Sequence, residues 1–187
     1  ILQASKALTD VHSSKLYHGR LSNESFYIDE YFSLGIGNIG HTIKGATEDI
    51  HRYFIPPEAR KEEIDIQTNP SQDYLEKKQQ YDVYSFGVLM LELLTLKPFY
   101  DIEHRMKTKE DDFYDKIVQK RLNDLKNEDQ DFKNIVLQCI EPDRNRRIKT
   151  SLLFESLKNI ISKKENGETI IESLQVVRKP LNIFESL

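Results

Sequence analysis

The sequence has one cysteine and no tryptophan in 187 residues, and its basic residues do not outnumber its acidic ones. Cys139 alone cannot form an internal disulfide or a thiolate zinc site, which excludes a disulfide-stapled secreted domain and favours a reducing, cytoplasmic compartment. The formal net charge is -4, so the chain lacks the broad positive field that nucleic acid or anionic lipid would require. The longest apolar run, from Phe86 to Leu94, is shorter than the roughly 18 to 20 residues that a bilayer requires. Neither nucleic acid nor a membrane is an expected partner.

Apolar residues are present in the amount that one modest core needs. Hydrophobic residues make up 38% of the chain and charged residues 31%, which fits a single globular domain with a lean core. The chain starts at Ile1 with no initiator methionine and no cleavable signal pattern, so we expect it to be part of a longer protein.

Hydrophobic periodicity predicts a mostly helical domain. A helical face recurs over residues 1 to 12, and a central helix that is apolar nearly all round begins at Asp82. Three further amphipathic helices are predicted at about 110 to 124, 130 to 140 and 149 to 163. The only strand signal is a hairpin, with strands at 25 to 28 and 31 to 34 and Asp29-Glu30 in the turn. The polar residues 60 to 80 read as a long loop.

Three patterns that suggest ligand chemistry have simpler explanations. Gly35 to Gly40 spells G-x-G-x-x-G after a strand, but no later strands could build the parallel sheet of a dinucleotide fold. The five histidines show no metal-ligand spacing. Cys139 lies on the apolar face of its predicted helix and reads as a core residue. We therefore expect neither a cofactor nor a metal.

Four segments, in order along the chain, carry a more specific signal. They are the stretch around His18-Gly19-Arg20-Leu21, the pair Pro57-Glu58, the stretch Asp82 to Leu89, and the stretch Cys139 to Arg147. Together they resemble the catalytic loop, the end of the activation segment, the start of the central helix and the late C-terminal motif of the eukaryotic protein kinase fold. The resemblance covers about residues 1 to 163 and implies a mainly α C-terminal lobe, built on a central buried helix with one small β-hairpin.

The residues that carry catalysis in that family do not match. Aligning His18 with the family histidine puts Arg20 at the catalytic aspartate, Ser22 at the loop lysine and Ser25 at the metal-binding asparagine. Arginine stays protonated and cannot act as a base. Our placement of the D-F-G motif at Ile36-Gly37-Asn38 puts Ile36 at the metal-binding aspartate, and residues 31 to 47 contain no Asp or Glu that could replace it.

The resemblance therefore implies an inactive pseudokinase with no catalytic, cofactor or metal residues. Tyr27, where the family has the apolar floor beneath adenine, is bulkier than the usual leucine, and ATP binding is not expected. The positions that hold the family's lobe together do match. By resemblance, Asp82 accepts hydrogen bonds from backbone amides around His18, Glu58 pairs with Arg147, and His18 is a structural histidine packed beneath the central helix.

The spacing of the motifs predicts an insertion and a C-terminal extension around the kinase-like lobe. The 24 residues from Glu58 to Asp82 imply a polar insertion at about 61 to 80, residues 164 to 187 form an apolar extension, and the family's N-terminal lobe is absent from this sequence. We expect protein partners, with docking faces near residues 41 to 57, the helix at 110 to 124 and the tail. The alternatives are a structural subunit of a large assembly, and an enzyme whose metal ligands are displaced to Asp29, Glu30 or a carboxylate of the N-terminal lobe.

Overall fold

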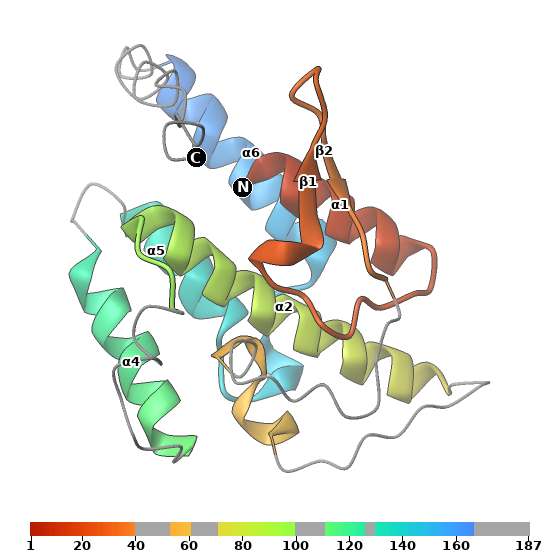
Figure 1. The fold of residues 1–187 in the computed structure, drawn as a ribbon, viewed down its shortest axis with the longest axis vertical. Coiled ribbons are helices and arrows are strands. Elements are labelled where there is room, and N and C mark those ends of the chain that lie inside the picture. Colours follow the sequence, from red (N-terminus) through yellow and green to blue (C-terminus); the bar gives the residue numbers. More distant parts are fainter. Residues whose placement is uncertain (40–52, 61–70, 100–110, 126–129, 167–187) are drawn as a thin grey trace, which may run out of the picture.

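A computed structural model describes residues 1–39, 53–60, 71–99, 111–125 and 130–166. It is mostly helical, with one two-stranded antiparallel sheet among these residues (Figure 1). In chain order the main elements are α1 (Leu2–Ser13), β1 (Phe26–Ile28), β2 (Leu34–Ile36), α2 (Gln72–Thr95), α4 (Asp111–Asp124), α5 (Gln130–Cys139) and α6 (Thr150–Asn166). Short 3-10 turns lie at Asn23–Ser25, Pro57–Ala59 and Arg144–Arg146. The mainly α kinase-like architecture with a small hairpin is therefore present.

Helix α2 runs through the middle of the molecule and starts ten residues earlier than predicted (Figure 1). The sequence places its beginning at Asp82, whereas the helix begins at Gln72. The Ser71 hydroxyl accepts a hydrogen bond from the backbone N–H of Tyr74, and Asp73 adds a negative charge to the first turn. Much of the expected 61 to 80 loop is thus a capped helix, because local capping outweighs the polar composition.

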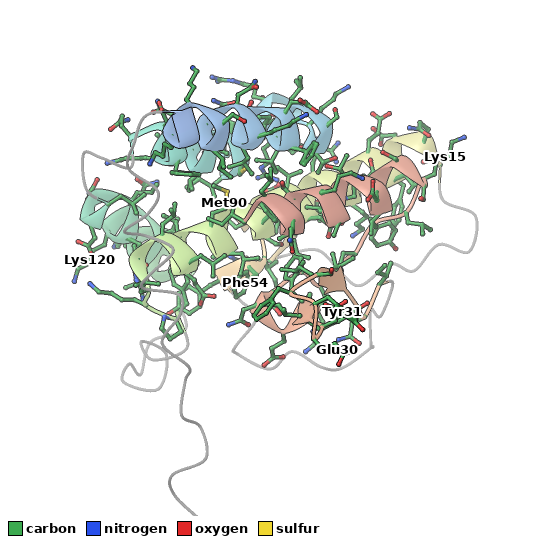
Figure 2. The ribbon with its side chains drawn as sticks, turned by 90° about the horizontal axis from the view of Figure 1, so that it is seen from above. Lys15, Glu30, Tyr31, Phe54, Met90 and Lys120 are labelled. Carbon is green, nitrogen blue, oxygen red and sulfur yellow. The ribbon has the colours of Figure 1, made fainter. Side chains whose placement is uncertain are left out.

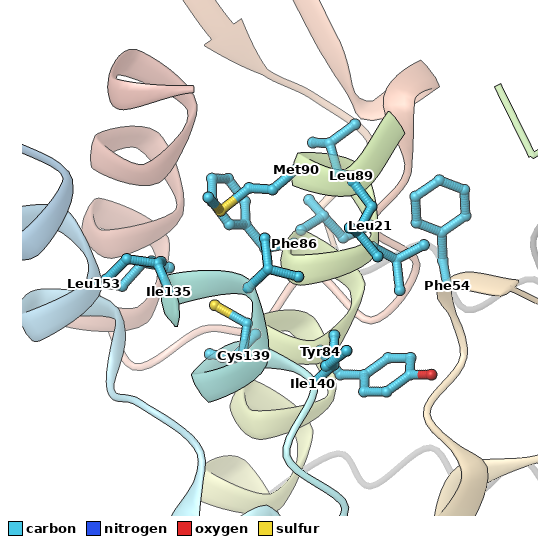
Figure 3. Close-up of a cluster of buried hydrophobic side chains, with 14 of the residues drawn as sticks. Leu21, Phe54, Tyr84, Phe86, Leu89, Met90, Ile135, Cys139, Ile140 and Leu153 are labelled. Carbon is cyan, nitrogen blue, oxygen red and sulfur yellow. The ribbon is translucent and has the colours of Figure 1, made fainter. Parts of the chain in front are cut away.

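The core forms where the other helices close around α2. Helix α5 packs on α2 and on α6, α6 packs on α1, and α4 lies against the later part of α2. Figure 3 shows Phe86 and Met90 of α2 facing Ile135 and Cys139 of α5. At Gly87 an added Cβ would stand 2.6 Å from the Cβ of Cys139, so α2 and α5 approach this closely only because that position is glycine.

The hairpin is present, but its second strand is displaced from the predicted residues. Phe26 pairs with Ile36 and Ile28 with Leu34, so β2 spans 34 to 36 and not 31 to 34. The Asp29 carboxylate accepts hydrogen bonds from the backbone of Tyr31 and Ser33. This bonding holds residues 29 to 33 as a longer turn than a two-residue Asp-Glu turn.

Two expected boundaries fall at the margins of the described residues. Helix α6 continues to Asn166, so the division expected between 163 and 164 lies inside a helix. The tail from 167 and the segments 40–52 and 61–70 lie outside the described residues. Within the part that is described, none of the helices combines the length and apolar character of a membrane span.

Candidate functional site

Asp82 holds the loop that follows α1 against the central helix. Its carboxylate accepts hydrogen bonds from the backbone N–H of His18 at 2.6 Å and of Gly19 at 2.8 Å. The Nε2 atom of His12 lies 3.1 Å from the same carboxylate. Asp82 is almost fully buried, and these three contacts satisfy the oxygens of its side chain, as the burial of a polar group requires. The contacts of Asp82 with His18 and Gly19 are those that the resemblance implies.

His18 is completely buried and connects two backbone segments. Its Nδ1 accepts a hydrogen bond from the N–H of Arg20 at 3.2 Å, and its Nε2 lies 2.7 Å from the carbonyl oxygen of Gly37. Because a carbonyl can only accept, Nε2 carries the proton and Nδ1 is the acceptor. The imidazole is therefore neutral in this arrangement, and it fixes the loop to the end of β2.

Ser22 and Ser25, which the resemblance sets at the family's lysine and asparagine positions, are both buried. The Ser25 hydroxyl accepts from the backbone N–H of Ser22 at 3.0 Å and donates to the carbonyl of Arg20 at 3.3 Å. Its hydrogen bonds thus stay within the loop. In this geometry Ser25 stabilises the loop conformation.

Arg20 is partly buried, and its backbone is held at both ends by His18 and Ser25. Its guanidinium makes no hydrogen bond or ion pair within the described part of the chain. The residues next to it in the loop, Leu21 and Ser22, are buried. Arg20 therefore belongs to a loop whose backbone is hydrogen-bonded on both sides of it, and its positive charge has no anionic partner among the described residues.

Ile36, which the sequence comparison sets at the metal-binding aspartate, lies within β2. It pairs with Phe26 and packs partly buried against the core. Asn38 is the first residue past the His18 contact at Gly37, is exposed, and has a left-handed backbone with φ of 59°. Gly37, the middle residue of the Ile36-Gly37-Asn38 stretch, is the one that contacts the loop, through its carbonyl oxygen and His18.

Tyr27 lies flat on the strand beside it. An added Cβ at Gly35 would stand 2.1 Å from the Tyr27 ring, and one at Gly37 would stand 3.7 Å from it. Gly35 is thus the platform on which the aromatic ring rests, which gives the glycines of the G-x-G-x-x-G pattern a packing role. The other side of Tyr27 is open to solvent.

Glu58 and Arg147 form an ion pair with a shortest distance of 2.6 Å. The Arg147 side chain is 0% exposed and that of Glu58 is 29% exposed. Arg147 also donates to the carbonyl oxygens of Glu141 at 2.7 Å and Gln80 at 3.2 Å. One guanidinium therefore joins α2, the 3-10 turn at Pro57–Ala59 and the segment before α6.

The carboxylates proposed as substitute metal ligands lie in the hairpin turn. Asp29 is committed to the backbone amides of Tyr31 and Ser33, and Glu30 is exposed. Figure 2 shows Glu30 and Tyr31 at the outer end of the hairpin. Among the described residues, no cluster of three or more His, Cys, Asp or Glu could hold a metal ion.

A family model described as protein tyrosine and serine/threonine kinase matches residues 1–157. The chain belongs to this kinase family. A comparison with curated proteins finds no match. The matched range includes the loop at His18, the hairpin, the central helix and the Glu58–Arg147 pair, so each contact described above lies within a kinase-family domain.

A second buried network in this kinase-family domain escaped the sequence analysis. The Glu92 carboxylate accepts a hydrogen bond from the Phe99 backbone at 2.6 Å, and burial raises the pKa of Glu92, an effect that the Phe99 amide and Arg121 partly offset. Arg121 of α4 donates to the carbonyls of Lys97 and Pro98. The one sequence feature that indicates this network is the charged Glu92 within the apolar run from Phe86 to Leu94.

Proposed function

We propose that this kinase-family domain is a pseudokinase, which transfers no phosphoryl group and acts as a protein-binding scaffold or allosteric partner. The observation that carries the proposal is Arg20. A kinase uses a carboxylate at this position to accept the proton of the substrate hydroxyl. A guanidinium cannot accept it, because it remains protonated at every accessible pH.

The neighbouring positions support the same conclusion. The hydroxyl of Ser25 hydrogen-bonds within the loop, to Ser22 and Arg20, where the family has a metal-binding amide. Ile36, which our placement sets at the metal-binding aspartate, has no ligand atom in its side chain, and Asn38 two residues later supplies only a neutral amide where a carboxylate is needed to neutralise Mg²⁺. Since catalysis in this family depends on metal-assisted charge stabilisation, losing both ligands and the base removes three parts of one mechanism.

The protein-binding part of the proposal is supported by the hairpin. Tyr31 and Phe32 are 78% and 82% exposed, and the Asp29 carboxylate holds the turn that presents them. Tyr27 and Ile28 are also exposed on the same hairpin. Exposed apolar side chains gathered in this way are typical of contact sites. A partner protein that covers these side chains would use the domain as a binding surface, which requires no catalysis at the loop of Arg20.

The test is a phosphotransfer assay on the full-length protein with Mg-ATP and with Mn-ATP, using radiolabelled γ-phosphate and a mixed peptide substrate. We expect no incorporation above a reaction without protein. The matched variant is Arg20→Asp, which restores the family's base alone. It should also be inactive, because the metal ligands that Ser25 and Ile36 replace are still missing.

Transfer by the wild-type protein that disappears in an Asp29→Asn variant would overturn the proposal and favour displaced metal ligands. Melting of the protein with ATP, first without and then with magnesium, gives an independent measurement. An ATP-dependent rise in the melting temperature of the kind expected from linkage would contradict the expected absence of nucleotide binding. It would leave the loss of phosphoryl transfer intact.

A further inference from the structure

We infer that the loop around Arg20 is an anion site that binds a phosphate monoester, the group carried by a phosphorylated side chain of a protein partner. The inference rests on the proposed loss of catalysis, because it assigns a use to the charge that replaces the catalytic base. The starting observation is that Arg20 is partly buried and has no ion pair or hydrogen bond to its side chain within the described residues. A cation that is partly removed from water is costly unless an anion accompanies it.

The loop that carries Arg20 is already organised before any ligand arrives. The N–H of Arg20 donates to His18 at 3.2 Å, and its carbonyl accepts from Ser25 at 3.3 Å. Leu21 and Ser22 are buried on its C-terminal side. The backbone of the loop is therefore ordered before a ligand binds, which reduces the entropic cost of binding.

Polar groups near this loop suit a phosphate. His18 joins the backbone of Arg20 to that of Gly37, so the exposed Asn38 follows directly after the residue that the loop contacts. Asn23, in the 3-10 turn of the same loop, is also exposed. An arginine can donate two parallel hydrogen bonds to phosphate oxygens, and amide groups can add further donors. The loop thus combines one cation, Arg20, with two neutral amides, and its one carboxylate, Glu24, lies exposed in the same 3-10 turn as Asn23.

The same features argue against a metal or a neutral ligand. A guanidinium repels cations, and the nearby serines are held by hydrogen bonds within the loop. A carboxylate could also pair with the Arg20 guanidinium. A phosphate monoester, however, carries about two negative charges near neutral pH and accepts more hydrogen bonds than a carboxylate does. The chemistry of Arg20 therefore favours phosphate.

The experiment follows the melting temperature of the full-length protein during a titration with inorganic phosphate, at constant ionic strength set by chloride. Phosphate stabilises many proteins slightly by exclusion from their surface, without saturating. We expect an additional, saturable rise in the wild type, loss of that component in Arg20→Ala with binding weakened at least tenfold, and a reduced rise in Arg20→Lys, which keeps the charge but not the paired donors.

The matched control is Lys120→Ala, which removes the same charge from the exposed surface of α4. Figure 2 shows Lys120 at the far end of the molecule from the hairpin. This variant should retain the saturable component. An unsaturable rise that is equal in all four proteins would overturn the inference. So would a saturable rise that Arg20→Ala leaves unchanged.

Two further arms separate the sources of the phosphate group. A short peptide containing phosphoserine is compared with its unphosphorylated form and with ADP. Tighter binding of the phosphopeptide than of ADP, again lost in Arg20→Ala, supports a phosphorylated partner. Tighter binding of ADP overturns that source and assigns the site to a nucleotide. The phosphotransfer assay is independent of all these readouts, so a failure here leaves the proposed loss of catalysis untouched.

Discussion

Asp82 and His18, 64 positions apart in the chain, meet through a 2.6 Å hydrogen bond from the His18 backbone amide to the Asp82 carboxylate. The bond lies inside the protein, where an unpaired N–H and an unpaired carboxylate would each be costly. It explains how the loop around His18 is held in one conformation in a domain that we propose to be inactive. Asp82 of α2 holds the loop through backbone amides, so the conformation of the loop does not depend on which side chain stands at position 20.

Replacing Asp82 should separate the two parts of this contact. Asp82→Ala leaves the amides of His18 and Gly19 without an acceptor, and we expect it to lower the free energy of unfolding by about 2 to 5 kcal/mol. Asp82→Asn keeps one acceptor oxygen but places an NH₂ group opposite one of the two backbone N–H groups. Its loss of unfolding free energy should therefore be smaller, about 1 to 3 kcal/mol. Unfolding in guanidinium chloride measures both. Equal losses for the two variants would contradict this assignment of roles.

Arg147 should matter more for stability than its partner Glu58. Truncating Arg147 removes donors from backbone carbonyls as well as from the carboxylate, whereas Glu58 is partly exposed and can be hydrated. We expect Arg147→Ala to cost about 3 to 5 kcal/mol and Glu58→Ala less. A double-mutant cycle should give a coupling energy of about 0.5 to 3 kcal/mol. A larger loss for Glu58→Ala would contradict this order, and would show that leaving the buried Arg147 guanidinium without a counter-charge costs more than losing its carbonyl contacts.

Leu96 ends α2 in a left-handed conformation, with φ of 52°, and its side chain is 83% exposed. Leu96→Gly should therefore stabilise the protein by about 0.5 to 1 kcal/mol, because it relieves backbone strain and gives up almost no burial. The control is Leu93→Gly, one turn earlier in the right-handed helix, which should destabilise by about 1 kcal/mol. Thermal melting of both variants decides the point. If both variants were stabilised, or both destabilised, relief of backbone strain at Leu96 would be excluded as the cause.

Glu92 predicts a pH dependence of stability with a definite sign. Its pKa is raised in the folded protein, chiefly by burial, so the folded state binds the proton more tightly than the unfolded state does. The contribution of Glu92 is then most favourable below its ordinary pKa of about 4.3 and is lost as the pH rises through the raised value.

The matched variant for this effect is Glu92→Gln, which can still accept from the Phe99 amide but cannot ionise. Relative to this variant, the wild type should gain stability when the pH falls from about 8 to about 4. Denaturant unfolding at both pH values gives the difference. A wild type that loses stability relative to the variant on acidification would contradict the raised pKa.

Local pattern by itself determined most of the helices. The ends of α4, α5 and α6 lie within a few residues of their predicted positions, because an apolar face that repeats every three to four residues is a property of short segments. The start of α2 was also encoded locally, in Ser71 and Asp73. The prediction missed it because it gave more weight to the polar composition of residues 60 to 80 than to these capping residues. The hairpin register was missed because the bonding of Asp29 within the turn does not show as a strand pattern.

The contacts of the candidate site were decided by the tertiary structure. The pairing of Asp82 with His18 and of Glu58 with Arg147 spans 64 and 89 residues, and it could be expected only through the family resemblance. The partial burial of Arg20 without an anionic partner, the packing of Ile36 in a strand and the left-handed end of α2 at Leu96 had no signal in the sequence. Periodicity reports which side of an element faces a core, whereas burial, charge pairing and hydrogen bonding depend on which distant segment packs against it.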